Sequence, residues 1–144
     1  MKIFSYLNFD GKAEEAMKFY QSILGGEFPM GFMYMGDMPD GPPMSDEDKK
    51  RVMHVTLQLD DGLVLMGSDT FPGFGPPLQK GNQTHLYLDL PSKEAVDDAF
   101  GKLAEGGSIE MPLEETFWGS YFGNLTDKYG ICWMLNYDLK KEEA

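Results

Sequence analysis

Residues 114–136, EETFWGSYFGNLTDKYGICWMLN, contain both tryptophans and the only cysteine of this 144-residue chain. Two β-prone runs, Tyr121–Thr126 and Ile131–Tyr137, flank the sequence Asp127-Lys128-Tyr129-Gly130. Asp at the first position and Gly at the fourth position of a turn between such runs are typical of a β-hairpin. The stretch therefore predicts two antiparallel strands.

Each half of the chain also has the apolar periodicity of one helix. In the first half the periodic residues are Ala13, Ala16, Met17, Tyr20, Ile23 and Leu24, followed by Gly25-Gly26. In the second half they are Val96, Ala99, Phe100, Leu103 and Ala104, followed by Gly106-Gly107. Ser92 precedes the second helix and is an N-cap residue type. Paired glycines after each pattern supply the backbone conformation that ends a helix.

Strands are predicted on both sides of each helix. In Val52–Leu59 the residues alternate, so that the aliphatic side chains share one face and His54, Thr56 and Gln58 share the other. Asp60-Asp61-Gly62 is a hairpin signal. The other predicted strands are Ile3–Phe9, Glu27–Met38, Leu63–Ser68, His85–Leu90 and Ser108–Leu113.

The two halves repeat one order of elements, and an offset of 80 residues superimposes their helices, whereas the hairpins need an offset of 68. Pairs that coincide are Ser5 with His85, Tyr20 with Phe100, Gly26 with Gly106, and Met66 with Met134. The sequence thus predicts an α+β fold of two tandem βαβββ modules, residues 1–72 and 80–140, in a single domain spanning 1–144. We expect the modules to form a curved mixed-sheet cup with the helices outside.

Two segments lack any periodicity. Residues 69–83 contain three prolines and three glycines and are predicted to be a linker between the modules. Residues 37–50 are rich in Pro, Gly, Asp and Met and are predicted to be an exposed, mobile loop, whose role the sequence leaves open.

The composition narrows the class of protein. A hydrophobic content of 42% predicts a globular protein with a core. The formal net charge of -12 argues against nucleic acid and anionic membranes as partners and favours cationic or neutral ligands. No apolar run approaches the length of a membrane span, and no signal peptide is recognisable, so we expect a cytoplasmic protein. The lone Cys132 lies within an apolar run and is predicted to be a buried structural thiol.

The sequence resembles the PhnB-like branch of the vicinal oxygen chelate superfamily, which includes glyoxalase I, bleomycin-resistance proteins and extradiol dioxygenases. The resemblance covers nearly the whole chain. The matching residues are Tyr6–Ala16 (YLNFDGKAEEA), His54, Leu63–Asp69 (LVLMGSD), Glu115–Gly119 (ETFWG), Thr126-Asp127, Gly130 and Trp133–Asn136 (WMLN). This resemblance implies a homodimer and a cup that holds a small molecule, and it does not specify one activity.

The resemblance also implies a place for a divalent metal ion, held by two side chains of each module. Carried onto this sequence, the four positions are Ser5, Met66, His85 and Met134. Only His85 suits a divalent ion, because a thioether is a soft, neutral ligand. A one-residue slip of the alignment brings no Glu or second His into either closing strand. We therefore expect no metal ion and no other cofactor.

The two histidines, His54 and His85, are candidates for general bases or for hydrogen-bonding partners of a ligand, and the alternative is a structural role at strand ends. Asp69 is predicted either to pair with a histidine or to cap a turn. Trp118 and Tyr121 are candidates for aromatic pocket walls or for core residues. The complete set of pocket candidates is His54, Gln58, Met66, Asp69, His85, Tyr87, Trp118, Tyr121 and Met134.

Two functions remain open at this point. The first is metal-independent binding of an unidentified small molecule, as in bleomycin-resistance proteins. The second is an enzyme of the isomerase, lyase or dioxygenase type that uses the cup histidines, with or without a divalent metal. A third function associated with this branch, ubiquinone-pathway methyl transfer, is disfavoured because no Gly-rich loop between a strand and a helix is present to hold S-adenosylmethionine.

Overall fold

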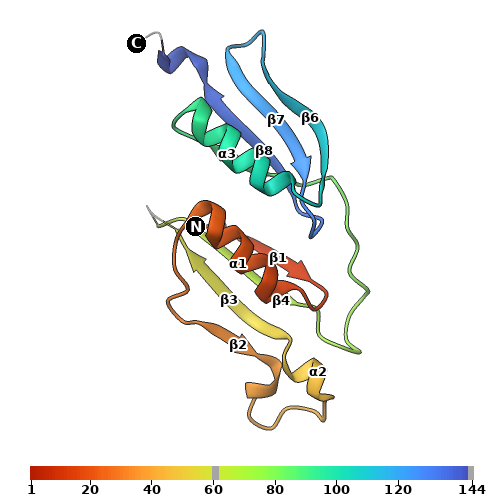
Figure 1. The fold of residues 1–144 in the computed structure, drawn as a ribbon. Helices are drawn as coiled ribbons and strands as arrows, with labels where there is room; N and C mark the ends of the chain where they lie inside the picture. Colours follow the sequence, from red (N-terminus) through yellow and green to blue (C-terminus); the bar gives the residue numbers. More distant parts are fainter. Residues whose placement is uncertain (60–61, 143–144) are drawn as a thin grey trace. The chain divides into compact units, whose positions relative to one another are not determined.

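The computed structural model describes residues 1–59 and 62–142, with side chains through residue 140 (Figure 1). The chain divides into two compact units, Met1–Gln79 and Lys80–Ala144, and each is described by itself. The predicted turn at Asp60-Asp61-Gly62 lies largely outside the described residues. Beside it, the Leu59 amide donates to the Leu63 carbonyl at 2.8 Å.

The first unit is a four-stranded mixed sheet with one long helix. Its elements are β1 (Ser5–Phe9), α1 (Ala13–Leu24), β2 (Phe32–Tyr34), the 3-10 turn η1 (Met35–Asp37), α2 (Asp46–Lys49), β3 (Val52–Gln58) and β4 (Val64–Asp69). The strand order is β1-β4-β3-β2, with β1 parallel to β4 and the other pairs antiparallel.

The second unit has the same topology. Its elements are β5 (Leu86–Asp89), α3 (Lys93–Ala104), β6 (Ser108–Glu115), β7 (Ser120–Thr126), β8 (Cys132–Asp138) and the 3-10 turn η3 (Leu139–Glu142). The strand order is β5-β8-β7-β6, and only β5 and β8 are parallel. The predicted α+β fold of two βαβββ modules is therefore confirmed. That the modules share one cup within one domain stays a prediction.

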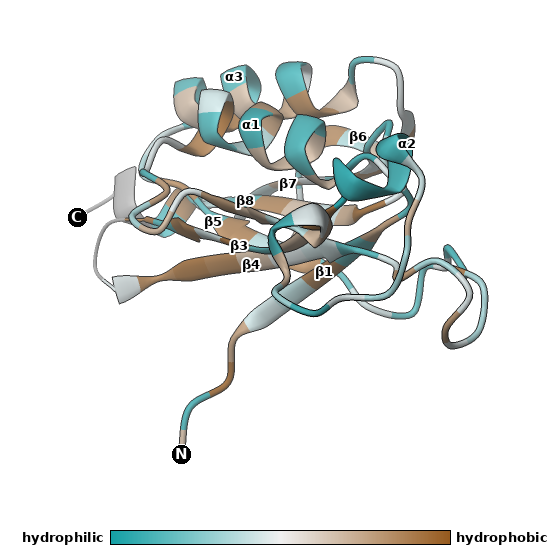
Figure 2. Cartoon of the chain, turned by 90° about the horizontal axis from the view of Figure 1, so that it is seen from below, coloured by the Kyte–Doolittle hydropathy of each residue, from teal (hydrophilic) through white to brown (hydrophobic). Residues whose placement is uncertain are grey.

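In each unit the helix covers one face of its own sheet, and the core lies between them (Figure 2). In the first unit α1 buries the predicted residues Ala13, Ala16, Met17 and Tyr20. In the second unit α3 buries Val96, Ala99, Phe100 and Leu103, and the Ser92 hydroxyl accepts the Ala95 amide at 3.1 Å. The outward surfaces of both helices are hydrophilic, as the helical periodicity predicts (Figure 2).

The predicted hairpin forms around a buried carboxylate. Asp127 is 3% exposed, and its Oδ1 accepts the backbone amides of Tyr129 at 2.8 Å and Ile131 at 3.1 Å. Its Oδ2 accepts the Trp133 indole N–H at 2.9 Å. Asp127 therefore fixes both the turn and the orientation of the largest core side chain. Cys132 is buried, as predicted.

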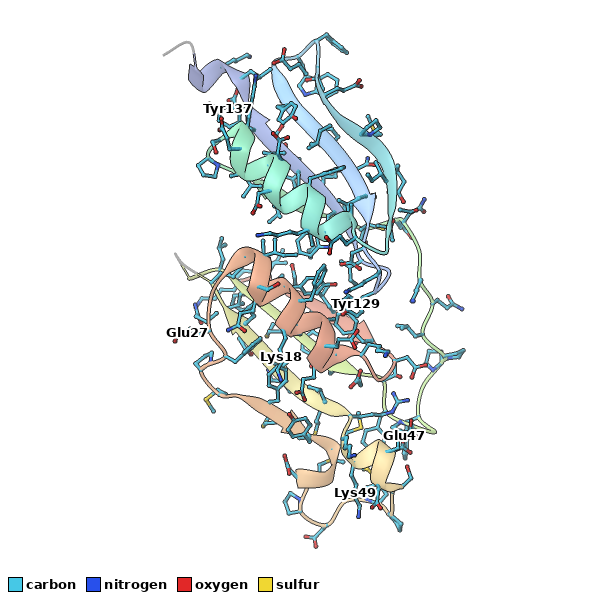
Figure 3. The ribbon with its side chains drawn as sticks, viewed as in Figure 1. Lys18, Glu27, Glu47, Lys49, Tyr129 and Tyr137 are labelled. Carbon is cyan, nitrogen blue, oxygen red and sulfur yellow. The ribbon has the colours of Figure 1, made fainter. Side chains whose placement is uncertain are left out.

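Three local predictions need correction. Residues 37–50 are not wholly irregular, because Ser45 accepts the Asp48 amide and caps the short helix α2, which carries Glu47 and Lys49 (Figure 3). The β-prone segment Glu27–Met38 yields only the three-residue strand β2, which then turns into η1.

No helix among the described residues is long and apolar enough to cross a membrane.

The third correction concerns the offset between the two halves. Tyr6 pairs with Met66 in the first unit, and Tyr87 pairs with Met134 in the second. The parallel strands therefore superimpose at an offset of 81, not 80, whereas helices α1 and α3 keep the offset of 80. Helix α3 therefore begins one residue sooner after Tyr87 than α1 begins after Tyr6.

Candidate binding site on the open faces

The candidate site consists of the open faces, by which we mean the face of each sheet opposite its helix. Strand alternation assigns the residues to these faces. In the first unit the open face carries Tyr6, Asn8, His54, Thr56, Gln58, Met66 and Ser68. In the second unit it carries Tyr87, Asp89, Phe122, Asn124, Met134, Asn136 and Asp138.

A histidine with hydroxyl partners on both sides marks the first open face. His54 Nδ1 lies 3.0 Å from the Tyr6 hydroxyl, and His54 Nε2 lies 3.0 Å from Thr56 Oγ1. The rings of Tyr6 and His54 are 5.6 Å apart. The imidazole is thus held in one orientation across β4, with one hydroxyl at each ring nitrogen.

A groove of about 690 Å³ lies at the ends of β1 and β4 in the same unit, and His54 is not among its lining residues. Its polar side includes Asn8 and Ser68, whose side chains are 3.4 Å apart. Its apolar side is formed by residues 71–78 of the predicted linker, including Phe71 and Phe74, which pack edge to face at 5.0 Å. The linker thus supplies one wall of a groove that the sequence did not indicate.

The open face of the second unit is aromatic. The ring of Phe122 lies 6.4 Å from Tyr87 and 6.5 Å from Trp118. Tyr87 is 57% exposed and Trp118 is 52% exposed. Large exposed rings grouped on one surface are typical of ligand or partner contacts.

Beneath these rings lie polar groups. Asn136 is only 7% exposed, and its Nδ2 donates to Asp89 Oδ1 at 3.1 Å. Asn136 Oδ1 and Asn124 Oδ1 are buried without a hydrogen-bond partner. A pocket of about 300 Å³ is lined by Tyr87, Asp89, Trp118, Ser120, Asn136, Asp138 and Lys140. Burial, followed by the negative charges of Asp89 and Asp138, raises the pKa of Tyr87.

The four positions that the resemblance implies for a metal ion, Ser5, Met66, His85 and Met134, do not come together in the structure. Ser5 pairs with the buried Leu65 and so faces away from Met66, whose open-face neighbour is Tyr6. His85 precedes the Tyr87–Met134 pair by two residues, about 6–7 Å along the strand. The open-face positions are therefore Tyr6, Met66, Tyr87 and Met134.

These side chains do not fit a divalent ion, since they offer two neutral thioethers and two phenols. Among the described residues, no group of three or more His, Cys, Asp or Glu is arranged to hold a metal ion.

Four of the other pocket candidates lie on an open face or line a pocket, and two lie at or just before strand ends. Met66, Tyr87 and Met134 lie on open faces, and Trp118 lines the pocket of the second unit. Gln58 is exposed at the end of β3, where its backbone pairs with Glu27. His85 is half-buried just before β5.

Two candidates have structural partners instead. The Tyr121 hydroxyl donates to Asp97 Oδ1 on α3 at 2.6 Å, so Tyr121 lies on the helix-covered face and the expectation that it lines the pocket is wrong. Asp69 is 5% exposed and accepts the backbone amides of Ala13 at 3.0 Å and Val52 at 2.8 Å. It anchors the start of α1 rather than pairing with a histidine, and it also lines the groove of the first unit, as the sequence predicted for a pocket residue.

The sequence reasoning missed Phe122 and Asn136 as site residues. Strict alternation along the strands identifies both. Phe122 follows the helix-side residue Tyr121 in β7, and Asn136 continues the alternation of β8, where Trp133 and Leu135 lie on the helix side. The burial of Asn136 and the missing partner of its oxygen had no signal in the sequence.

Comparisons with known proteins agree with this fold. The family described as 3-demethylubiquinone-9 3-methyltransferase matches residues 1–136. The protein YjdN of Escherichia coli (strain K12) is 33% identical over 140 residues, which cover 94% of this chain and 95% of YjdN.

Three solved structures extend the comparison. Protein PA1353 from Pseudomonas aeruginosa is 36% identical with a TM-score of 0.83, covering 96% of this chain and 98% of PA1353. The PhnB protein from Bacillus cereus is 32% identical with a TM-score of 0.75, covering 95% of this chain and 99% of that chain. The fosfomycin resistance protein FosX from Listeria monocytogenes is 15% identical with a TM-score of 0.61, covering 100% and 98%, and so shares the fold alone. The chain therefore belongs to the PhnB-like family, described as 3-demethylubiquinone-9 3-methyltransferase.

Proposed function

We propose that this protein binds a small molecule on the open faces of its sheets without a divalent metal ion. The observation that carries the proposal is the register of the parallel strands, which puts Tyr6 beside Met66 and Tyr87 beside Met134. These residues occupy the superfamily's ligand positions with phenols and thioethers. They form adaptable apolar surface suited to an organic ligand.

Methyl transfer is not part of the proposal. In doubly wound α/β folds, nucleotide cofactors such as S-adenosylmethionine are held at a Gly-rich loop between a strand and a helix. Here the connections are Asp10-Gly11-Lys12 before α1 and Leu90-Pro91-Ser92 before α3. Neither connection fits that cofactor.

The test measures metal content and ligand binding on protein purified without chelators. We expect less than a tenth of an equivalent of Mg, Mn, Ni or Zn, and thermal shifts by small organic compounds that persist in EDTA. Stoichiometric divalent metal, or ligand shifts that disappear with EDTA, would contradict the proposal. The double variant Tyr87→His, Met134→Glu is a positive control, because it puts two good metal ligands on neighbouring strands and should gain a metal-dependent shift.

The second candidate function is proton transfer by His54, of the isomerase or lyase type. It is favoured by the hydroxyls of Tyr6 and Thr56, each 3.0 Å from one ring nitrogen, because such contacts orient a general base. Ligands found in the thermal screen would be incubated in D2O with the protein and with His54→Gln. If a carbon-bound proton of the ligand exchanges with deuterium and the exchange is lost in His54→Gln, catalysis is supported. If the ligand binds but no proton exchanges, the result supports binding alone.

We also propose a homodimer. The edge strand β6 exposes Ile109 at 53% and Met111 at 40%, and an exposed apolar edge favours pairing with another copy. Light scattering after size-exclusion chromatography should give twice the monomer mass of 16.2 kDa. A cytoplasmic location stays a prediction.

A further inference from the structure

The pocket of about 300 Å³ on the open face of the second unit contains a buried acceptor without a donor. Asn136 lines it, is 7% exposed, and has no hydrogen bond at Oδ1. Its Nδ2 donates to Asp89 Oδ1 at 3.1 Å, which fixes the amide, because a flipped amide would bring Oδ1 against the carboxylate. Asn136 Oδ1 therefore lacks a donor, which the N–H or O–H of a ligand entering the pocket would supply.

A second oxygen of the same kind lies one residue pair away. Asn124 pairs with Met134 on the neighbouring strand, whereas Asn136 pairs with Phe122, so the two amides lie in successive rows of the open face. Asn124 Oδ1 is also buried and without a partner. Native proteins pair nearly all buried polar atoms, so two neighbouring exceptions indicate a missing donor.

The pocket is also negative. Two carboxylates, Asp89 and Asp138, line it against one cation, Lys140. The Asp138 Oδ1 accepts the backbone amide of Lys140 at 3.0 Å. The raised pKa of Tyr87, which burial and then these two carboxylates cause, is consistent with this negative potential.

Aromatic rings complete the surroundings. Trp118 and Tyr87 line the pocket and remain half exposed. Phe122 lies 6.4 Å from the Tyr87 ring and 6.5 Å from the Trp118 ring. Ring faces attract cations, and they also contact the apolar part of an organic ligand.

We propose that this pocket binds organic ligands through a protonated primary amine or guanidinium group, which donates to Asn136 Oδ1 while Asp89 and Asp138 balance its charge. This inference rests on the proposed function and specifies its ligand class. An anion would face two carboxylates and unpaired acceptors. A quaternary ammonium would satisfy the charge and the rings, but it has no N–H for the amide oxygen.

The experiment compares four probes on the full chain by calorimetry at low salt: benzylamine, benzyltrimethylammonium, benzyl alcohol and benzoate. We expect benzylamine to bind at least tenfold more tightly than each of the others. Asn136→Leu should reduce that preference at least fivefold, and Asp138→Asn should weaken benzylamine at least threefold. Asp97→Asn, which changes a carboxylate on the helix side, should leave benzylamine binding unchanged.

Other outcomes separate the two proposals. Equal binding of benzylamine and benzyltrimethylammonium, or tighter binding of benzoate or benzyl alcohol, overturns the amine inference and leaves metal-independent binding in place. Binding of any probe only with added Mn²⁺ or Zn²⁺ overturns the proposed function itself. If Mg²⁺ or Ca²⁺ displaces benzylamine and binds the pocket more tightly than benzylamine does, the inference is overturned, and the pocket is a site for a hard cation. If Asn136→Leu does not fold, Asp138→Asn with the four probes decides.

Discussion

The two units share one topology but treat their open faces differently. In the first unit the polar groups satisfy each other: Tyr6 and Thr56 contact both nitrogens of His54, and Asn8 contacts Ser68. In the second unit the oxygens of Asn124 and Asn136 have no partner, and large rings lie exposed around them. The two units therefore share the backbone scaffold but differ in the side chains of their open faces, and under our proposal the second unit is the one prepared for a ligand.

The buried carboxylates of the two units give the largest expected effect. Asp127→Ala leaves two backbone amides and the Trp133 indole N–H without their acceptor, so we expect a loss of about 4 kcal/mol in the free energy of unfolding. Asp69→Ala leaves two backbone amides without their acceptor, so the free energy of unfolding should fall by a smaller amount, about 2–3 kcal/mol. Denaturant unfolding measures both, with the exposed Asp98→Ala as control. Equal losses would mean that Asp127 in the hairpin has no greater role than Asp69 at the start of α1.

The glycines after each helix test how closely the repeat is matched. A Cβ at Gly26 would lie 2.5 Å from the Gln58 carbonyl oxygen, and one at Gly107 would overlap the Thr126 carbonyl oxygen. Because Gly26 also has a φ of +90°, Gly26→Ala should cost about 3 kcal/mol and Gly107→Ala about 2 kcal/mol.

Gly101→Ala provides the matched control for these variants. It lies within α3 with open space around its Cβ position, and it should stabilise the protein by about 0.5–1 kcal/mol. A loss at Gly101 similar to that at Gly107 would show that the close approach to Thr126 is not the cause.

Much of this fold was predictable because its signals are local or repeated. Strict alternation in Val52–Gln58 and the turn at Asp127–Gly130 fix strands and a hairpin, and the paired glycines end both helices. The short helix α2 escaped prediction because four residues carry no periodicity, and its N-cap Ser45 lies among prolines and acidic residues.

The site was less predictable because it depends on which face of the sheet each strand residue occupies and on contacts between strands. Helix α3 begins one residue sooner after Tyr87 than α1 begins after Tyr6, so the offset of 80 for the helices becomes 81 for the paired strands. The open-face position is therefore Tyr6 rather than Ser5. Independently of that offset, alternation along β7 puts Phe122 on the open face and Tyr121 on the helix side. The partners of Asp69 lie 56 and 17 residues away along the chain, beyond any local pattern.

A smaller effect tests the contrast between the open faces directly. Asn124→Leu removes a buried oxygen that has no partner, so it should raise the free energy of unfolding by about 1 kcal/mol. Thr56→Val removes the hydroxyl that contacts His54, so it should lower that free energy by about 1 kcal/mol. If urea unfolding gives changes of opposite sign for the two variants, the contrast between the two open faces is supported. A loss for Asn124→Leu would mean that its oxygen is already satisfied in the unliganded protein.

The smallest effect concerns a feature that both units share on their helix sides. Tyr34 donates to Glu14 on α1 at 2.6 Å, and Tyr121 donates to Asp97 on α3 at 2.6 Å. The hydrogen bond to Glu14 is the largest cause that raises the pKa of Tyr34 to about 12, and the bond to Asp97 is the largest cause that raises the pKa of Tyr121.

A raised phenol pKa has a definite consequence for stability. The protonated phenol is favoured in the folded protein, so its contribution is complete below the ordinary tyrosine pKa of about 10 and is lost as the pH rises toward 12 for Tyr34. In an absorbance titration, Tyr34→Phe should remove the ionisation near pH 12, and Glu14→Gln should move it toward 10. Asp97→Asn should lower the Tyr121 pKa in the same way. If Tyr34→Phe instead removes an ionisation near pH 10, the contact between β2 and α1 does not persist in solution, and this likeness between the units fails.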